Sequence, residues 1–351
     1  MVSRICSVEL SNARQKRERA IIRRDASRSP FRLFEIGERV RAMCFARYGG
    51  PDILTLEQIP APEPKAGEVL VRVAASSINP VDWKIASGAL RLIFWLRLPA
   101  VPGFDVAGTV VAAGPGVTGF APGDRVHARM TKIGACAEMV VVRADVLAHV
   151  PSEMSLDEAA ALPLAGMTAL QSLRDFADVP VVQAHQRVLV VGASGGVGHL
   201  AVQIAKAMGC TVVGVCSSRN LAFVRSLGAD EVIDYTQPDP FQGQAPFDVV
   251  IDAVADNPAP YNRLLAPCGR YVAVLPGPRS LGWMLLNPLR RKKCRPMLLK
   301  PSAADLEWLD RLYVAGNLRI VIDERFALER LPEAWQRSMQ GRTVGKLVIT
   351  F

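Results

Sequence analysis

The spacing of hydrophobic residues changes near residue 155. Before that point, short Val-rich segments are separated by Gly and Pro, which is typical of β-strands joined by turns. The expected strands are 43–50, 53–60, 68–78, 107–114, 124–130 and 137–150. The first part of the chain is therefore predicted to form a β-rich domain.

Beyond residue 155, helix-like and strand-like segments alternate. The expected helices are 156–176, with Ser152 or Ser155 as the N-cap, 199–209, 219–229 and 258–269. The expected strands are 187–191, 210–216, 231–235, 247–254 and 270–275. Because these strands are apolar almost throughout, the pattern predicts a parallel sheet with helices on both faces. The remaining elements are expected at 305–316 (helix), 319–328 (strand), 331–341 (helix) and 346–351 (strand).

The length of 351 residues indicates two domains, and the composition is that of a globular protein, with 50% hydrophobic and 21% charged residues. No run of 18 apolar residues occurs, so no membrane-spanning helix is predicted. The seven Cys are odd in number and lack CxxC spacing. They indicate neither a disulfide framework nor a zinc knuckle, and they favour a reducing compartment such as the cytoplasm.

The net charge of +9 is concentrated in two segments. Residues 1–42 hold 11 Lys/Arg against 5 Asp/Glu, and Pro258 to Ala304 hold nine Lys/Arg and no acid. A nucleic-acid-binding protein is expected to carry basic residues on a recognisable reading element, and the sequence has none. We therefore expect no nucleic-acid partner.

Residues 1–42 are interpreted as a basic N-terminal extension. Transit peptides are rich in Arg and Ser but poor in acids, whereas this segment contains five acidic residues. This composition argues against import into an organelle and favours an extra segment upstream of the first strand.

A glycine-rich turn is the strongest local signal. A buried strand at 187–191 leads into Gly192-Ala193-Ser194-Gly195-Gly196-Val197-Gly198 and then into an amphipathic helix. Small residues let the backbone approach a diphosphate, and the N–H groups at the start of the helix stabilise its charge. The predicted cofactor-binding residues here are Gly192, Ser194, Gly195, Gly196, Val197 and Gly198.

The same turn also matches GxSxG, the nucleophile motif of many hydrolases, with Ser194 as nucleophile. That fold needs a His later in the chain, but none of the four His follows His199. His199 itself lies only five residues after Ser194, in the same predicted helix. Hydrolase activity is therefore disfavoured, and a glycine-rich turn that binds nothing remains the structural alternative.

The end of the second strand of the parallel sheet predicts the choice of cofactor. NAD-binding sites usually carry an acid there, but this chain has Ser217, Ser218 and Arg219. Hydroxyls and a guanidinium suit the 2′-phosphate of NADPH, and Tyr235 after the third strand offers another hydroxyl. The alternative is that Arg219 only begins a helix in solvent.

Six segments together carry a family resemblance: 76–88, 102–126, 160–173, 192–209, 226–235 and 345–351. They resemble the zinc-free quinone oxidoreductase branch of the medium-chain dehydrogenase/reductase superfamily, close to the NADPH-dependent alkenal/one reductases and the chloroplast-envelope quinone oxidoreductase homologues. The resemblance covers about 43–351. It implies an α/β protein in which 43–166 and 302–351 form a GroES-like catalytic domain and 167–301 form a doubly wound Rossmann domain. It also assigns Thr168 and Lys346 to the cofactor site.

The chain departs from the zinc alcohol dehydrogenases at the metal ligands. Asn79 stands where those enzymes have their first Cys ligand, and Phe104-Asp105 matches their His-Glu pair. No four-Cys lobe is present. No metal is therefore expected, and alcohol oxidation, which needs help in handling the hydroxyl, is disfavoured.

The resemblance points instead to hydride transfer to an enal, an enone or a quinone. In the matching loop, Asn79 would donate to the substrate carbonyl, Lys84 would stabilise the enolate or relay a proton, and Asp82 would orient Lys84 or the backbone. The alternative is that these residues are structural, with Asp82 at the start of a helix and Lys84 in solvent. Two further interpretations of the whole chain are an alcohol or sugar dehydrogenase and a non-catalytic NADPH-binding protein, and either a monomer or a homodimer is compatible with the sequence.

Residues 281–301 combine apolar side chains with clustered Arg and Lys. The resemblance puts this segment after the last strand of the sheet, near the cleft. It would be either a solvated loop that partly covers the site or a peripheral contact with anionic lipid.

Overall fold

The computed structural model describes residues 38–91, 95–180, 185–255 and 257–351. Most of the predicted N-terminal extension, residues 1–37, lies outside the described residues. Residues 40–351 form one compact unit.

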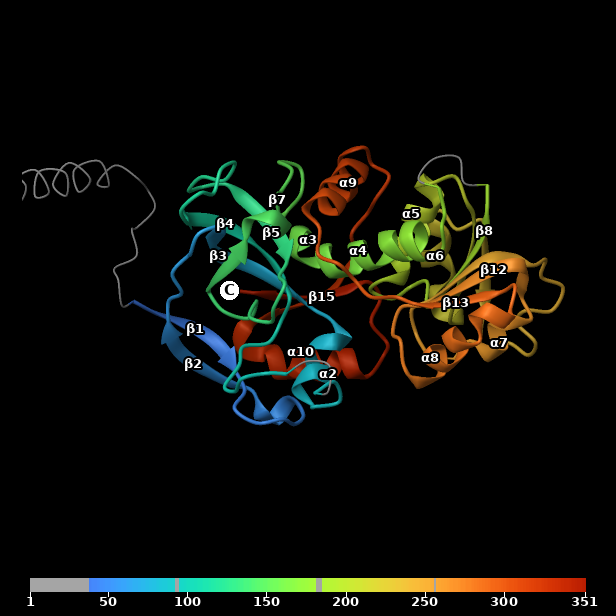
Figure 1. Cartoon of the computed structure of the whole chain (residues 1–351), viewed down its shortest axis with the longest axis horizontal. Coiled ribbons are helices and arrows are strands. Elements are labelled where there is room, and N and C mark those ends of the chain that lie inside the picture. The colour runs from blue at the N-terminus through green and yellow to red at the C-terminus, as the bar shows by residue number, and fades with distance from the viewer. Residues whose placement is uncertain (1–37, 92–94, 181–184, 256) are drawn as a thin grey trace, which may run out of the picture. The chain divides into compact units, whose positions relative to one another are not determined.

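A seven-stranded sheet forms the core of the β-rich part (Figure 1). Its order is β14-β15-β3-β4-β5-β7, and β6 also pairs with β3. The strands are β3 (Glu68–Ile78), β4 (Asp105–Ala113), β5 (Arg125–Arg129), β6 (Met139–Arg143), β7 (Leu147–His149), β14 (Ile322–Ala327) and β15 (Lys346–Thr350). Because Leu347 in β15 pairs with Ile78 in β3, the last strand returns beside the start of the 79–84 loop.

A six-stranded sheet forms the second part, and every pair of neighbouring strands in it is parallel. Its order is β10-β9-β8-β11-β12-β13. The strands are β8 (Arg187–Val191), β9 (Thr211–Cys216), β10 (Glu231–Asp234), β11 (Phe247–Asp252), β12 (Leu265–Ala273) and β13 (Lys293–Pro296). The chain order reverses between β8 and β11, and ligands of such sheets bind at the carboxyl ends of the strands at this point.

Helices cover both faces of the parallel sheet (Figure 1). Side chains of α5 (Gly198–Ala207) and α6 (Leu221–Ser226) pack in one hydrophobic cluster with one face. Side chains of α7 (Ala259–Asn262) and α8 (Pro278–Leu285) pack in a separate cluster with the other face. The predicted fold class, a GroES-like part with a doubly wound Rossmann part, is confirmed.

The other described elements connect or cover these sheets. They are β1 (Arg39–Cys44), β2 (Thr55–Pro60), α2 (Pro80–Ala86), α9 (Ala303–Val314), α10 (Leu331–Met339) and the short helices η2 (Pro51–Ile53), η3 (Ala144–Val146), η5 (Ser218–Asn220), η6 (Asn287–Leu289) and η7 (Leu328–Arg330).

The helix predicted at 156–176 is divided into three. It consists of α3 (Leu156–Ala161), α4 (Pro163–Gln171) and the π-helical η4 (Ser172–Phe176). Pro163 has no N–H and begins the second helix. Ser155 is the N-cap of α3, since its hydroxyl accepts the Glu158 N–H and the Glu158 carboxylate accepts the Ser155 N–H.

Two expectations in the Rossmann part are wrong. Of the helix predicted at 258–269, only Ala259–Asn262 is helical, and Leu265 already pairs with Phe247 in the sheet. The segment 281–301 is not a loop after the last strand, because α8 and η6 lead into a further strand, β13. The short sequence of β13, KCRP, has no strand-like alternation, and its pairing with β12 makes it a strand.

The first strand begins before the expected residue 43. In β1, Val40 and Ala42 are buried, and the Arg41 Nε donates to the Glu138 carboxylate at 2.7 Å. We predict that deleting residues 1–37 leaves the melting temperature and activity unchanged. Deleting 1–42 removes the buried Val40 side chain, worth about 2 kcal/mol, and the β1 backbone pairing, so the melting temperature falls by several degrees. Thermal unfolding of both deletions measures this, and equal melting temperatures would contradict it.

Candidate cofactor and active site

The glycine-rich turn follows β8 and folds tightly on itself. Gly192 has φ +76°, a left-handed conformation that favours glycine. A Cβ on Gly198 would lie 2.0 Å from the Gly192 carbonyl oxygen, and one on Gly192 would lie 2.4 Å from Val254 Cγ2. Both positions therefore require glycine for this close approach.

These residues fit a bound dinucleotide diphosphate. The turn lies at the strand-order reversal and leads directly into the ten-residue helix α5, whose N-terminus favours negative charge. Gly195, Gly196 and Val197 are half-buried, so the turn is accessible and carries little side-chain bulk. The Asp252 carboxylate, at the end of β11, accepts the N–H groups of Val254 and Ala255 and holds the neighbouring loop.

In the described part of the chain, no histidine is hydrogen-bonded to the Ser194 hydroxyl. This hydroxyl accepts a hydrogen bond from the Asn220 side chain at 2.9 Å. Burial lowers the pKa of His199 to about 4, so the ring is neutral. Its Nδ1 donates to the Gly195 carbonyl, and its Nε2 accepts the Val321 N–H. This arrangement excludes His199 as the base of a hydrolase.

The carboxyl ends of β9 and β10 bring together Ser217, Ser218, Arg219 and Tyr235. Arg219 is exposed, and Tyr235 is 59% exposed. The Ser218 hydroxyl donates to the Asp234 carboxylate at 2.6 Å, and such donors hold the pKa of that carboxyl far below its ordinary value. Asp234 is not among the predicted site residues, because only Tyr235 was considered at the end of β10. Its position at the end of the neighbouring parallel strand is the signal that would have found it.

A buried polar cluster surrounds Asn79, which follows β3 and is the N-cap of α2. Asn79 is only 2% exposed, and both ends of its side-chain amide are engaged. Its Nδ2 donates to the Asp105 carboxylate at 2.8 Å, and its Oδ1 accepts from Lys346 Nζ at 2.6 Å. One amide therefore links β3, β4 and β15.

Asp105 and Lys346 are also buried. Asp105 accepts the Ser77 hydroxyl at 2.6 Å and the Leu164 N–H at 2.9 Å, and Lys346 donates to the Ile78 carbonyl at 3.0 Å. Burial raises the pKa of Asp105 and lowers that of Lys346, while the charge of each opposes the shift of the other. In this cluster, the side-chain amide of Asn79 bridges the Lys346 amino group and the Asp105 carboxyl group.

Lys346 joins this cluster to the glycine-rich turn. A Cβ on Gly196 would lie 3.2 Å from Lys346 Cδ, and the Gly345 N–H donates to the Ser194 carbonyl at 2.9 Å. The lysine stem therefore lies against the turn while its ammonium reaches Asn79.

Asp82 is buried beside this cluster. One carboxylate oxygen accepts the Asn79 N–H at 2.7 Å, and the other has no hydrogen-bond partner in the described part of the chain. Burial raises the pKa of Asp82 to about 7. The Arg129 guanidinium lies 4.2 Å from the centroid of the Phe104 ring, and burial lowers its pKa.

The raised pKa of Asp82 predicts a pH-dependent stability. A carboxyl whose pKa is raised in the folded state stabilises the fold fully at pH values below its unfolded pKa. This stabilisation is lost as the pH rises toward 7. Asp82→Asn keeps an acceptor for the Asn79 N–H but carries no charge. Its free energy of unfolding, relative to the wild type, is expected to increase between pH 4 and 8 by up to about 4 kcal/mol.

Urea unfolding at several pH values measures this difference. Asp239→Asn, which changes an exposed carboxylate, is the matched control and is expected to show a much flatter difference. A flat difference for Asp82→Asn would show that folding does not raise the pKa of Asp82.

Lys84 lies outside the hydrogen-bonded cluster. It is half-buried on α2, with Nζ 5.6 Å from the centroid of the Trp83 ring, and burial lowers its pKa. It forms no ion pair within the described ranges. Thr168 is buried on α4, one turn after Leu164, which contacts Asp105. The structure thus brings Asn79, Asp82 and Lys346 together and adds Asp105, Ser77 and Arg129.

The residues at the zinc-ligand positions do not fit a catalytic zinc. Asn79 is bonded to an ammonium, Phe104 has no ligand atom, and the Asp105 carboxylate accepts three hydrogen bonds from Ser77, Asn79 and Leu164. Within the described residues, no three His, Cys, Asp or Glu side chains are grouped as metal ligands would be.

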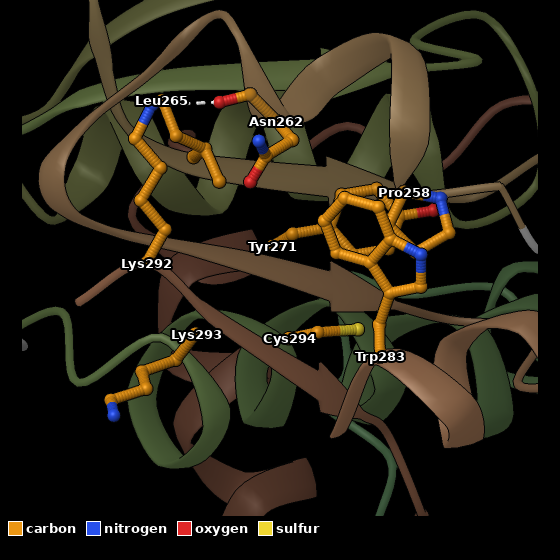
Figure 2. A pocket seen from close by; sticks show the side chains of 8 residues that line it. All are labelled: Pro258, Asn262, Leu265, Tyr271, Trp283, Lys292, Lys293 and Cys294. Atoms are coloured by element: carbon orange, nitrogen blue, oxygen red, sulfur yellow. Dashed lines mark hydrogen bonds between the residues drawn. The ribbon is translucent and has the colours of Figure 1, made fainter. Parts of the chain in front are cut away.

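A hollow lies elsewhere, at the β13 edge of the parallel sheet, between β12, β13, α7 and α8 (Figure 2). It is lined by Pro258, Asn262, Leu265, Tyr271, Trp283, Lys292, Lys293 and Cys294. None of these is a predicted site residue, and the Tyr271 hydroxyl is bonded to Asp252 at 2.7 Å. We do not assign the reaction to this hollow.

Comparisons with known proteins agree with this fold. Residues 65–152 match the alcohol dehydrogenase GroES-like domain, and 227–349 match a family described as zinc-binding dehydrogenase. The chloroplast envelope quinone oxidoreductase homolog of Arabidopsis thaliana is 37% identical over 325 residues, covering 89% of this chain and 99% of that protein. The chloroplastic NADPH-dependent alkenal/one oxidoreductase of the same plant is 31% identical, covering 90% and 80%.

Among solved structures, the quinone oxidoreductase from Coxiella burnetii is similar, with a TM-score of 0.82 and 31% identity over 90% of this chain and all of that one. Together with the glycine-rich turn, these matches define an oxidoreductase of the medium-chain dehydrogenase/reductase superfamily, which uses a nicotinamide dinucleotide. Within that superfamily, the chain belongs to the quinone oxidoreductase type. Among its described helices, none has the length and apolar character needed to cross a membrane.

Proposed function

We propose that this protein is an NADPH-dependent reductase that transfers hydride to the β-carbon of an enal or enone, or to a quinone, without a zinc ion. The observation that carries the proposal is the contact of Lys346 with both the glycine-rich turn and Asn79. The candidate cofactor-binding turn is thereby adjacent to a polar cluster whose residues do not suit a zinc ion. The names of the relatives support the same substrate classes.

The bound nicotinamide supplies the hydride. In a conjugated carbonyl the β-carbon is already electrophilic, so the protein has to orient the reactants and stabilise negative charge on the carbonyl oxygen. Both ends of the Asn79 side-chain amide are already hydrogen-bonded, to Lys346 and to Asp105. We therefore assign Asn79 to positioning the loop rather than to donating a hydrogen bond to the substrate carbonyl. Lys84, with no carboxylate partner in the described residues, is our candidate donor to the enolate.

NADPH is the cofactor that we propose, on the basis of the exposed Arg219 beside Ser217. A guanidinium forms charge-assisted bonds with a phosphate, worth roughly 1.5–3 kcal/mol. Asp234 opposes this preference, since its carboxylate repels a 2′-phosphate and occupies the Ser218 hydroxyl. The two residues should therefore have opposite effects on cofactor choice.

Arg219→Ala is expected to reduce the ratio of kcat/KM for NADPH to that for NADH about tenfold or more, because a charge-assisted bond is lost. Asp234→Asn is expected to raise the ratio by removing a like charge. Arg225→Ala, which changes another cation in the following helix, serves as the control and should leave the ratio unchanged. An unchanged ratio in Arg219→Ala would refute the assignment of the 2′-phosphate site.

Steady-state assays with a small enone, a quinone and a simple ketone test the reaction class. We expect NADPH consumption with the first two, unaffected by a chelator, and little with the ketone. Activity confined to the ketone would indicate an alcohol dehydrogenase. NADPH binding without turnover would indicate a non-catalytic protein.

We also propose a cytoplasmic location, because the cysteine content suits a reducing compartment. Burial raises the pKa of the Cys44 and Cys210 thiols to about 11, which keeps them protonated and unreactive. Imaging of the full chain with a C-terminal fluorescent tag tests the location, and accumulation inside an organelle would contradict it.

A further inference from the structure

The outer surface of α8 and its neighbours is unusually apolar. Six of the twelve large hydrophobic side chains that are exposed in the described part of the chain lie within 18 consecutive residues: Leu281, Met284, Leu285, Leu286, Leu289 and Leu298. Leu285 is 75% exposed and Leu289 is 86% exposed. We call the five of these residues that lie between Leu281 and Leu289, together with Arg290–Lys293, the apolar–basic face.

The local fold explains why these side chains point outward. In α8, Ser280 is buried, and Trp283 packs against the cluster that contains Tyr271 and Phe247. Figure 2 shows Trp283 and Tyr271 lining the same hollow. Because one side of the helix is used in this way, Leu281 and Leu285, which are four residues apart, share the other side.

Within the described residues, no ion pair joins a cation of this face to an acid. Lys292 donates to the Asn262 carbonyl, Lys293 donates to the Asn287 and Arg290 carbonyls, and Arg290 stacks over Trp283 at 4.2 Å. Carbonyls and rings leave the positive charge uncompensated. Arg270 and Arg295, in contrast, form ion pairs with Asp178. Between Pro258 and Ala304 the sequence contains no acid at all.

We propose that the apolar–basic face docks on the surface of an anionic lipid bilayer. The leucines would enter the boundary between headgroups and acyl chains, and the cations would remain among the anionic headgroups. A second copy of the chain is a poor partner, because a twofold contact would bring Arg290–Lys293 against its own like charges. This inference is independent of the proposed reaction.

Vesicle flotation with the full chain tests the proposal. The probes are vesicles of phosphatidylcholine alone and of phosphatidylcholine with 30% phosphatidylglycerol, at low and at physiological salt. We expect at least tenfold tighter binding to the anionic vesicles. We also expect at least a tenfold loss of this binding in Leu285→Ser/Leu289→Ser and in Arg291→Glu/Lys292→Glu.

The matched controls are Val314→Ser/Met339→Ser and Arg311→Glu, which change exposed apolar and basic residues elsewhere. They should bind like the wild type, and all variants should keep the wild-type melting temperature. If the leucine variant and the Arg/Lys variant bind the anionic vesicles as tightly as the wild type, the proposal is wrong. Another basic segment, such as 1–42, would then carry the binding. The proposal would also be wrong if the protein bound neutral and anionic vesicles equally well. The same holds if the wild type were a dimer that only Leu285→Ser/Leu289→Ser dissociates. Tighter binding to polyglutamate than to the anionic vesicles would indicate an acidic protein partner instead.

Discussion

Replacing Lys84 by Met is expected to lower turnover with a small enone about 100-fold, with a much smaller effect on NADPH affinity. The reason is that a donor to the carbonyl oxygen is needed mainly in the transition state, where negative charge develops. Burial lowers the pKa of Lys84, so turnover in the wild type should decline on the alkaline side at a lower pH than an ordinary lysine would produce.

Two variants make this result specific to Lys84. Lys132→Met removes an exposed cation of the same domain and should retain full turnover. Lys84→Arg keeps a donor and should recover part of the activity while moving the alkaline decline to higher pH. If Lys84→Met retains full turnover, the reaction class survives, but the donor is another group.

Gly198→Ala is expected to have the second large effect. Its Cβ would lie 2.0 Å from a backbone oxygen of the turn, so the turn has to open. We expect a loss of about 1–3 kcal/mol in the free energy of unfolding and at least tenfold weaker NADPH binding, since the turn and the start of α5 would hold the diphosphate.

Gly282→Ala is the control for this substitution. A Cβ at Gly282, within α8, would meet nothing within 4 Å, so this variant should be neutral or slightly more stable. Thermal unfolding and NADPH titration of both variants measure the difference. Wild-type stability and NADPH affinity in Gly198→Ala would contradict the account of the turn.

The fold was predictable where the chain's pattern is local. Continuous apolar strands such as 187–191 and the glycine-rich turn that follows require only neighbouring residues to be recognised. The strand β13 was not predictable, because its four residues become a strand through pairing with β12. The start of β12 at Leu265 depends in the same way on its partner Phe247.

The candidate site was predictable as a set of residues but not as an arrangement. From the sequence, Asn79 is expected at the substrate and Lys346 at the cofactor. The structure joins the two side chains directly, across 267 positions of sequence. Asp105 completes that cluster. The sequence indicated only that Asp105 stands where the zinc alcohol dehydrogenases have the Glu of their His-Glu pair. The hydrogen bond between Ser218 and Asp234 was not predictable, because it depends on the pairing of β10 with β9.

The proposed reaction is defined by the carbon that receives the hydride. The decisive measurement is the position of deuterium in the product when NADPH labelled at the transferred position reduces a small enone in ordinary water. For an enone reductase, we expect label on the β-carbon and a solvent hydrogen on the α-carbon, with the carbonyl intact. Label on a carbinol carbon would contradict the proposed reaction and identify a carbonyl reductase.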